Sequence, residues 1–457
     1  MATPTPAPAA DPRPLWRVFL VFLGPMVLGN VLQGMSGTLN GIFVGQMLGT
    51  HALAATAGMF PIVFFLVSLV IGVGAGGSIL IGQAWGAREP DKVRHIAGNA
   101  ILAGLVVGLV AAVLGIAFAE PALRALRTPP EVLADAVLYA RTLMLAMPGL
   151  LLFILFSQLL RGVGDTFSPM VAMGLSTALS CLLTPALIRG WGGLPQLGLV
   201  SAAVATVASY AVALAWLAWY LRRRRHPLAL GAPLLREMRP RGPTLRLMLR
   251  IGMPAGVQMI VVSLAEIVLL ALVNDHGPDA VAAYGAVNQI VNYVQFPAMS
   301  IAITASILCA QAIGAGRTGR LGAITRTALM LNLVVTGALV LLGYALSERL
   351  LALFITQPEV IALAQSLLHI LLWSLLLYGW ASVLGGVMRA SGTVMVPMLI
   401  GVACIAFVEL PVAYGLSGPL GLQGVWISYP VTFAAMLALN AAYFQWVWRR
   451  RAVARLV

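Results

Sequence analysis

QAWGA at residues 83–87 returns as QAIGA at residues 311–315, a shift of 228 residues. RGVGDTFSPM at residues 161–170 returns as RASGTVMVPM at residues 389–398 with the same shift of 228 residues. A constant shift at two distant places indicates an internal duplication. The two halves of the chain are therefore expected to share one fold.

The composition is that of a membrane protein. Of the 457 residues 60% are hydrophobic and only 9% are charged, and the mean hydropathy is +0.96. Soluble domains carry about 25% charged residues, whereas charges are costly in hydrocarbon. A net charge of +14 could suggest nucleic acid as a partner, but the arginines cluster between long apolar runs. We therefore expect a lipid bilayer and no nucleic acid.

A helix that spans a bilayer needs about 20 apolar residues, and twelve segments meet this requirement. They are residues 16–39, 53–84, 95–119, 137–160, 168–188, 197–221, 246–273, 280–313, 324–346, 361–388, 394–415 and 422–448. The sequence thus predicts an all-α integral membrane protein with 12 transmembrane helices in two pseudo-symmetric six-helix lobes. Six spans in each copy make the repeats parallel.

The expected organisation follows from these spans. It comprises a disordered cytoplasmic tail (1–14), a first lobe (15–221), an arginine-rich cytoplasmic linker (222–244), a second lobe (245–448) and a basic cytoplasmic tail (449–457). With the N-terminus inside, 23 basic residues fall on the inner side and five on the outer side. This asymmetry predicts that both termini are cytoplasmic, in a bacterial inner membrane.

Several motifs restrict the chemistry. Gly72, Gly74 and Gly77 match the dinucleotide fingerprint, but they lie in an apolar run, where close helix packing is the better interpretation. The uncharged runs 52–87 and 280–316 predict long helices, bent at Pro61 and Pro297. The sequence has no GxxxxGK[ST] and no HExxH motif, so we expect no ATP-driven engine, no cofactor, no metal site and no enzyme.

Three titratable residues are candidates for ion coupling because ionisable groups at membrane depth mark ion pathways. Glu266 lies near the middle of the seventh span, and its alternative role is a structural hydrogen bond. Glu409 precedes Pro411 nearer the outer end of the eleventh span, where a solvated helix-end residue is an equal alternative. His369 could relay protons, but a packed, hydrogen-bonded histidine is the favoured interpretation.

Polar side chains predict the wall of a substrate cavity. Tyr284, Asn288, Asn292 and Gln295 share one face of the eighth span. Such a stripe can also hold helices together, and both interpretations stay open. The other expected cavity residues are Gln33, Asn40 and Gln258.

The pattern resembles the multidrug and toxic compound extrusion (MATE) family. The stretches that carry the resemblance are IFVGQMLGTHALAATAG (42–58), GQAWGA (82–87), LRGVGDTFSPM (160–170), GMPAG (252–256), AVAAYGAVNQI (280–290), AQAIGAG (310–316), MRASGTVMVPM (388–398) and GLQGVW (421–426). The resemblance implies an antiporter that expels cationic or amphiphilic compounds in exchange for protons or sodium.

Two departures from the family pattern bear on coupling. Many bacterial members carry an aspartate where this chain has Asn40, which cannot titrate. The sodium-coupled branch has an acid in the tenth span, and residues 361–388 contain none. We therefore expect proton coupling rather than sodium coupling, in a chain that acts as a monomer on a small-molecule substrate.

Two alternative functions remain at this stage. A flippase for lipid-linked precursors would need buried arginines for phosphate groups, and no arginine lies in the middle of a span. An intramembrane enzyme would need a nucleophile, acid and base together. The sequence does not name the exported compound.

Overall fold

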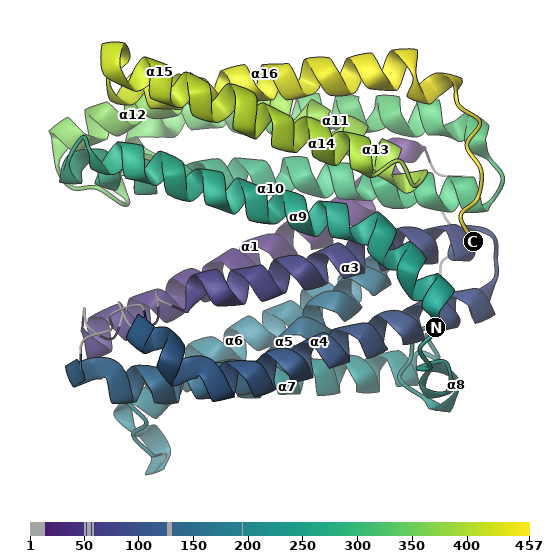
Figure 1. Ribbon diagram of the computed structural model, residues 1–457, viewed down its shortest axis with the longest axis horizontal. Helices are drawn as coiled ribbons and strands as arrows, with labels where there is room; N and C mark the ends of the chain where they lie inside the picture. Colours follow the sequence, from purple (N-terminus) through teal and green to yellow (C-terminus); the bar gives the residue numbers. More distant parts are fainter. Residues whose placement is uncertain (1–13, 50–51, 53–55, 57–58, 126–129, 194) are drawn as a thin grey trace. The chain divides into compact units, whose positions relative to one another are not determined.

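The computed structural model describes residues 14–457 except 50–51, 53–55, 57–58, 126–129 and 194. Within these residues the protein is all-helical, and twelve helices are long and apolar enough to cross a membrane (Figure 1). The expected fold class is confirmed. Residues 1–13 of the expected tail 1–14 lie outside the described residues.

The helices in chain order are α1 (Leu15–Leu48), α3 (Phe60–Gly86), α4 (Pro90–Ala125), α5 (Pro130–Val163), α6 (Phe167–Arg189), η2 (Trp191–Gly193), α7 (Val200–Arg223), α8 (Ala232–Arg236), α9 (Gly242–Asn274), α10 (Pro278–Gly314), η3 (Thr318–Arg320), α11 (Leu321–Ala352), α12 (Pro358–Leu372), α13 (Leu375–Ala390), α14 (Met395–Cys404), the π-helix η4 (Ile405–Glu409), α15 (Leu410–Leu420), α16 (Leu422–Trp446) and η5 (Trp448–Arg450).

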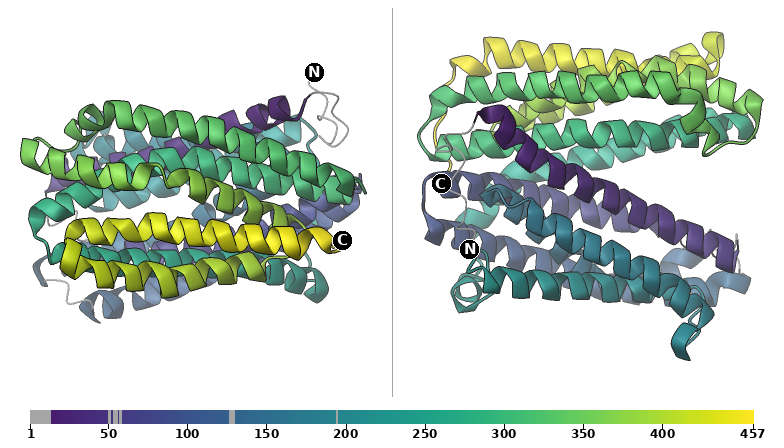
Figure 2. Two further views of the ribbon diagram at one scale, coloured as in Figure 1. Left: turned by 90° about the horizontal axis from the view of Figure 1, so that it is seen from above. Right: turned by 180° about the vertical axis from the view of Figure 1, so that it is seen from behind.

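The chain forms two compact units, and their boundaries fall inside α1 and α9. Unit 1 contains Leu28–Trp85 and Glu89–Gly256, and unit 2 contains residues 14–27, Gly86–Arg88 and Val257–Val457. In unit 1, α5 packs against α4 and α7, and α6 packs against α7. In unit 2, α10 packs against α11, α12 and α13, and α16 packs against α13 and α15. The helices of each unit run side by side in all views (Figure 2).

Two expected spans are interrupted helices. The tenth breaks between α12 and α13, where the Ser374 amide donates to the Leu371 carbonyl three residues earlier, at 3.0 Å. The eleventh contains η4. Pro61, expected to bend a long helix, is the second residue of α3, a position where proline is tolerated. Pro297 does lie inside the 37-residue helix α10.

Glycines bring α3 and the first half of α9 into backbone contact. A Cβ atom added at Gly72 would lie 2.9 Å from the Gly252 carbonyl oxygen, and one at Gly256 would lie 2.9 Å from the Ser68 carbonyl oxygen. A Cβ at Gly76 would overlap the Met248 carbonyl oxygen. The glycine motif therefore serves close helix packing, as expected, because small residues let helix backbones approach.

We expect Gly76→Ala to destabilise the protein, because the new methyl group meets backbone rather than a flexible side chain. Overpacking of this kind costs about 1–3 kcal/mol. The matched control is Gly149→Ala in α5, where nothing lies within 4 Å of the added Cβ. Thermal unfolding of both variants in detergent measures the difference, and equal stability of the two would contradict the packing role.

Candidate functional site

The candidate site lies in unit 2 and begins with a hydrogen bond between α9 and α10. The Tyr284 hydroxyl donates to Glu266 Oε2 at 2.6 Å. Glu266 lies eight residues before the end of α9 at Asn274, and Tyr284 lies six after the start of α10 at Pro278. At 1.5 Å per residue both side chains are about 9–12 Å from these helix ends, so the site lies inside the helical bundle.

The π-helix η4 brings Glu409 to the same site. The buried positions of α14 are Pro397, Gly401 and Cys404, and a continued α-helix would place residue 408 on this stripe. The wider turn places Glu409 there instead, with 7% of its surface exposed, and leaves Phe407 80% exposed. Of the two alternatives for Glu409, a solvated helix-end residue does not fit this burial.

A local cause for this wide turn is proline. Pro411 has no N–H group to donate to the carbonyl of Phe407, four residues earlier. Single π turns inside α-helices occur frequently at functional sites. The π-helix η4 packs against α16, whose Trp426 ring contacts Tyr284, the partner of Glu266.

Aromatic side chains of α16 complete the cluster. The Trp426 ring lies 5.5 Å from the Tyr284 ring and 5.8 Å from the Tyr429 ring, centre to centre. Trp426 is fully buried and Tyr429 is 7% exposed. Neither the Trp426 Nε1–H nor the Tyr429 hydroxyl has a hydrogen-bond partner of normal geometry among the described residues. Buried donors are normally paired. The Trp426 Nε1–H is therefore an unused donor in this cluster, whereas the Tyr429 hydroxyl lies near the Tyr284 hydroxyl.

The cluster can bind a proton or a small cation reversibly. A carboxylate charge in an apolar bundle is costly unless a partner, a proton or a cation neutralises it. Tyr284 supplies one partner to Glu266. The remaining acceptor oxygens of Glu266 and Glu409 are available for an incoming positive charge. Among the described residues no group of three or more His, Cys, Asp or Glu could hold a metal ion.

The expected polar stripe of α10 starts in this cluster and reaches the surface of unit 2. Tyr284 is buried, Asn288 one turn later is partly buried, and Asn292 a further turn along is exposed. Gln295, the last residue of the stripe, is partly buried. Gln258 of α9 instead packs against α14, since a Cβ at Gly401 would lie 2.5 Å from its Nε2 atom. The stripe stays a prediction for the cavity wall.

His369 has a packed, hydrogen-bonded environment between α11 and α12. Its Nε2 atom lies 3.2 Å from Ser347 Oγ, which also accepts from Gln365 Nε2 at 2.9 Å. The Tyr344 hydroxyl donates to the His369 carbonyl at 2.7 Å. The hydrogen bonds of His369 in the described part of the chain all lie within α11 and α12 and none reaches Glu266 or Glu409, so the structural interpretation fits it best.

Asn40 is part of a separate polar cluster in unit 1. Its Oδ1 atom accepts from Thr184 Oγ1 at 3.0 Å and from Ser180 Oγ at 3.3 Å, and its Nδ2 atom donates to Ser180 Oγ at 3.2 Å. The side chain thus joins α1 to α6 without a titratable group. Gln33, one of the expected cavity residues, is exposed on α1.

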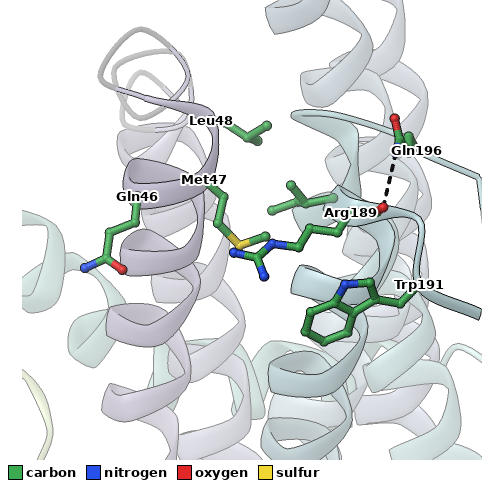
Figure 3. A pocket seen from close by; sticks show the side chains of 7 residues that line it. Gln46, Met47, Leu48, Arg189, Trp191 and Gln196 are labelled. Carbon is green, nitrogen blue, oxygen red and sulfur yellow. Dashed lines mark hydrogen bonds between the residues drawn. The ribbon is translucent and has the colours of Figure 1, made fainter.

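An open hollow of about 630 Å³ lies elsewhere in unit 1, between the end of α1 and the end of α6 (Figure 3). Arg189 lies over the Trp191 ring at 5.6 Å, and Gln196 donates to the Arg189 carbonyl at 3.1 Å. None of the predicted site residues and no carboxylate lines this hollow. The buried Glu409 and the partly buried Glu266 of unit 2 are therefore the better candidate for the functional site.

Comparison with known proteins identifies the family of the chain but bears on no single site residue. The MatE family model matches residues 25–186 and again residues 254–415. The two matches begin 229 residues apart, which agrees with the duplication seen in the sequence. The chain is 41% identical over 445 residues to the probable multidrug resistance protein YoeA of Bacillus subtilis, covering 97% of this chain and 96% of YoeA. It is 25% identical to the multidrug export protein MepA of Staphylococcus haemolyticus, covering 94% of this chain and 93% of MepA.

Solved structures share the fold. A MATE protein in complex with MaL6 aligns with a TM-score of 0.89 at 22% identity, over 97% of this chain and 98% of that one. The outward-facing conformation of a multidrug resistance MATE family transporter aligns with a TM-score of 0.88 at 22% identity, over 97% and 98% of the two chains. With the family model matched in both halves and a relative at 41% identity along nearly its whole length, the chain belongs to the MatE family of multidrug efflux transporters.

Proposed function

We propose that this transporter exchanges protons for small amphiphilic or cationic compounds by alternating access, with Glu266 and Glu409 as the ion-coupling pair. The observation that carries the proposal is the cluster of two carboxylates in one apolar bundle, with the Tyr284 hydroxyl 2.6 Å from Glu266. The membrane would be the bacterial inner membrane, with both termini cytoplasmic and the protein acting as a monomer.

The proposed cycle follows from the cost of buried charge. With the site closed and dry, a proton on the carboxylate pair removes the cost of an unneutralised charge. When a cationic compound enters, its charge can replace the proton, since both neutralise the same carboxylates. The proton-bound and the cargo-bound protein then favour different conformations, inward-open or outward-open. Exchange transport requires this difference.

The Tyr284 and Tyr429 side chains would act as positioning residues in this cycle. Tyr284 donates to Glu266, so it stabilises the charged form of that carboxylate. The Tyr429 hydroxyl, free of a partner of normal geometry in the described structure, can donate to a carboxylate or to a bound compound as the site changes occupancy.

Purified protein in liposomes tests the proposal. With an imposed pH gradient and no ATP, we expect uptake of ethidium, a lipophilic cation, into inside-out oriented vesicles. An imposed sodium gradient at constant pH should produce no uptake, because the tenth span holds no acid to complete a sodium site. Uptake that follows sodium and ignores pH would contradict proton coupling.

A further inference from the structure

The segment from the end of α7 to the first turns of α9, residues 222–250, has the densest cluster of positive charge in the chain. It contains nine arginines and one acidic residue, Glu237. All nine arginines are exposed; they are Arg222, Arg223, Arg224, Arg225, Arg236, Arg239, Arg241, Arg246 and Arg250. We call residues 222–250 the linker surface. It includes the end of α7, the short helix α8 and the first turns of α9.

One half of the linker surface is fastened to α4. His95 Nδ1 lies 2.9 Å from Glu237 Oε2, and His95 Nε2 lies 3.1 Å from Thr244 Oγ1. The Arg241 amide donates to Asn99 Oδ1 at 2.9 Å, and Asn99 is 2% exposed. Gly98 lies so close to Glu237 that an added Cβ would be 2.7 Å from its backbone. The arginines are therefore presented on a fixed backbone.

The other half is fastened through His226. Its Nε2 atom lies 4.0 Å from Asp165 Oδ2, and its Nδ1 atom accepts from the Leu228 amide at 3.2 Å. Leu228 and Leu234 are fully buried beneath the segment. A run of arginines that only directs membrane topology needs charge near the ends of the spans. Such a run does not need buried apolar residues beneath it or hydrogen bonds to a neighbouring helix, and this segment has both.

The charge on this surface persists at neutral pH. The hydrogen bond from His95, together with the charges of Arg241 and Arg239, lowers the pKa of Glu237, so this single acid is ionised. Burial lowers the pKa of His226, although the Asp165 charge opposes the change, so His226 is neutral. Nine positive charges therefore stand against one negative charge.

Aromatic residues place the linker surface at the height of lipid headgroups. The Arg223 guanidinium lies over the Trp219 ring at 5.5 Å, and the Arg224 guanidinium lies over the Tyr220 ring at 4.6 Å. Both rings belong to the last turns of α7. Trp and Tyr mark the boundary between hydrocarbon and headgroups. Leu235, 53% exposed, stands next to Arg236, so apolar and cationic groups lie side by side as on membrane-binding surfaces.

We infer that the linker surface is a binding site for anionic phospholipids, whose phosphodiester groups are held by Arg236, Arg246 and Arg250 while Leu235 enters the acyl boundary. In the described structure these three guanidinium groups have no ion pair and no hydrogen bond with the protein. Arg246 and Arg250 are four residues apart in α9 and share one face. Their donors are thus available to a phosphodiester, which arginine binds in a fork.

The lipid would join α8 to the start of α9 and so stabilise unit 1, because a ligand that binds the folded state raises stability by mass action. Its binding is independent of the ion that drives transport. The position beside Trp219 and Tyr220 favours a lipid headgroup over a free phosphate compound. By the arginine count this is the cytoplasmic leaflet.

Native mass spectrometry and thermal unfolding in nanodiscs test the inference, with phosphatidylcholine alone or mixed with phosphatidylglycerol. We expect phosphatidylglycerol to bind the wild type and to raise its unfolding temperature. Arg236→Gln/Arg246→Gln/Arg250→Gln should bind it about a hundredfold more weakly, since each arginine near an anionic surface contributes about fivefold. The difference in phosphatidylglycerol affinity between the wild type and the triple variant should become smaller in high salt, because salt screens the arginine charges.

Two matched variants separate this site from charge in general. Arg349→Gln removes an exposed arginine at the opposite end of a span and should bind phosphatidylglycerol as the wild type does. Thr244→Val keeps all nine arginines but removes the hydroxyl that bonds His95; it should insert normally and lose lipid affinity several-fold. Equal lipid affinity in the wild type and the triple variant overturns the inference, as does equal stabilisation by soluble glycerol phosphate.

Discussion

Replacing Glu266 by glutamine should abolish export driven by a pH gradient, while the protein still folds and inserts. Glutamine has nearly the shape of a protonated glutamate. It can still accept a hydrogen bond from the Tyr284 hydroxyl, which lies 2.6 Å from the Glu266 carboxylate in the wild type. It cannot bind or release a proton. Because a partly buried charge is also removed, stability should be equal or higher. Ethidium uptake in liposomes should fall to the level of protein-free vesicles.

The control for this substitution is Glu348→Gln, which alters an exposed carboxylate of α11 in the same unit and should transport normally. If Glu266→Gln transports normally while Glu409→Gln or His369→Ala is inactive, the coupling residue is assigned wrongly. If all three variants transport at wild-type rates with a pH gradient, proton coupling through these residues is wrong altogether.

Replacing Glu409 by glutamine should have the second largest effect, a loss of about tenfold in the rate of pH-driven uptake, since residues of one electrostatic cluster are coupled by about 0.5–3 kcal/mol. The loss should be milder than that of Glu266→Gln because the bond between Tyr284 and Glu266 remains. The same liposome assay measures it.

The double variant distinguishes a shared site from two independent ones. If Glu266 and Glu409 lie in one electrostatic cluster, their effects on stability are coupled, so the changes in unfolding temperature of Glu266→Gln and Glu409→Gln should not add in Glu266→Gln/Glu409→Gln. Changes that add would show that the two carboxylates act independently. Thermal unfolding of the three variants and the wild type in the same detergent measures the comparison.

The membrane architecture could be predicted from the sequence because it depends on apolar length and on repetition. Segments such as residues 96–118 carry no charge. In hydrocarbon the backbone must pair its own N–H and C=O groups, and a single segment does this only as a helix. The interruptions of the tenth and eleventh spans could not be predicted. They depend on local backbone hydrogen bonding near Ser374 and Pro411, and the hydropathy of both segments is that of an unbroken helix.

The candidate site could be predicted only in part. Glu266 stands out by its depth in an apolar run, which is a property of the sequence alone. Trp426 and Tyr429 were missed because aromatic residues in a span look like ordinary core. The burial of Glu409 follows from a single wide turn, and the partners of Asn40 lie 140 and 144 residues away in the chain. Proline at residue 411, directly after an acid and a leucine, is the signal that could have indicated the turn.

The most direct measurement of the central claim is proton release when a cationic compound binds. Ethidium is added to purified protein in weakly buffered detergent solution, and the pH is followed with an indicator dye. If cargo displaces a proton from Glu266, the wild type should release protons in a way that saturates together with ethidium binding, and Glu266→Gln should release none. Saturable ethidium binding to the wild type without proton release, or equal release by Glu266→Gln, would contradict it.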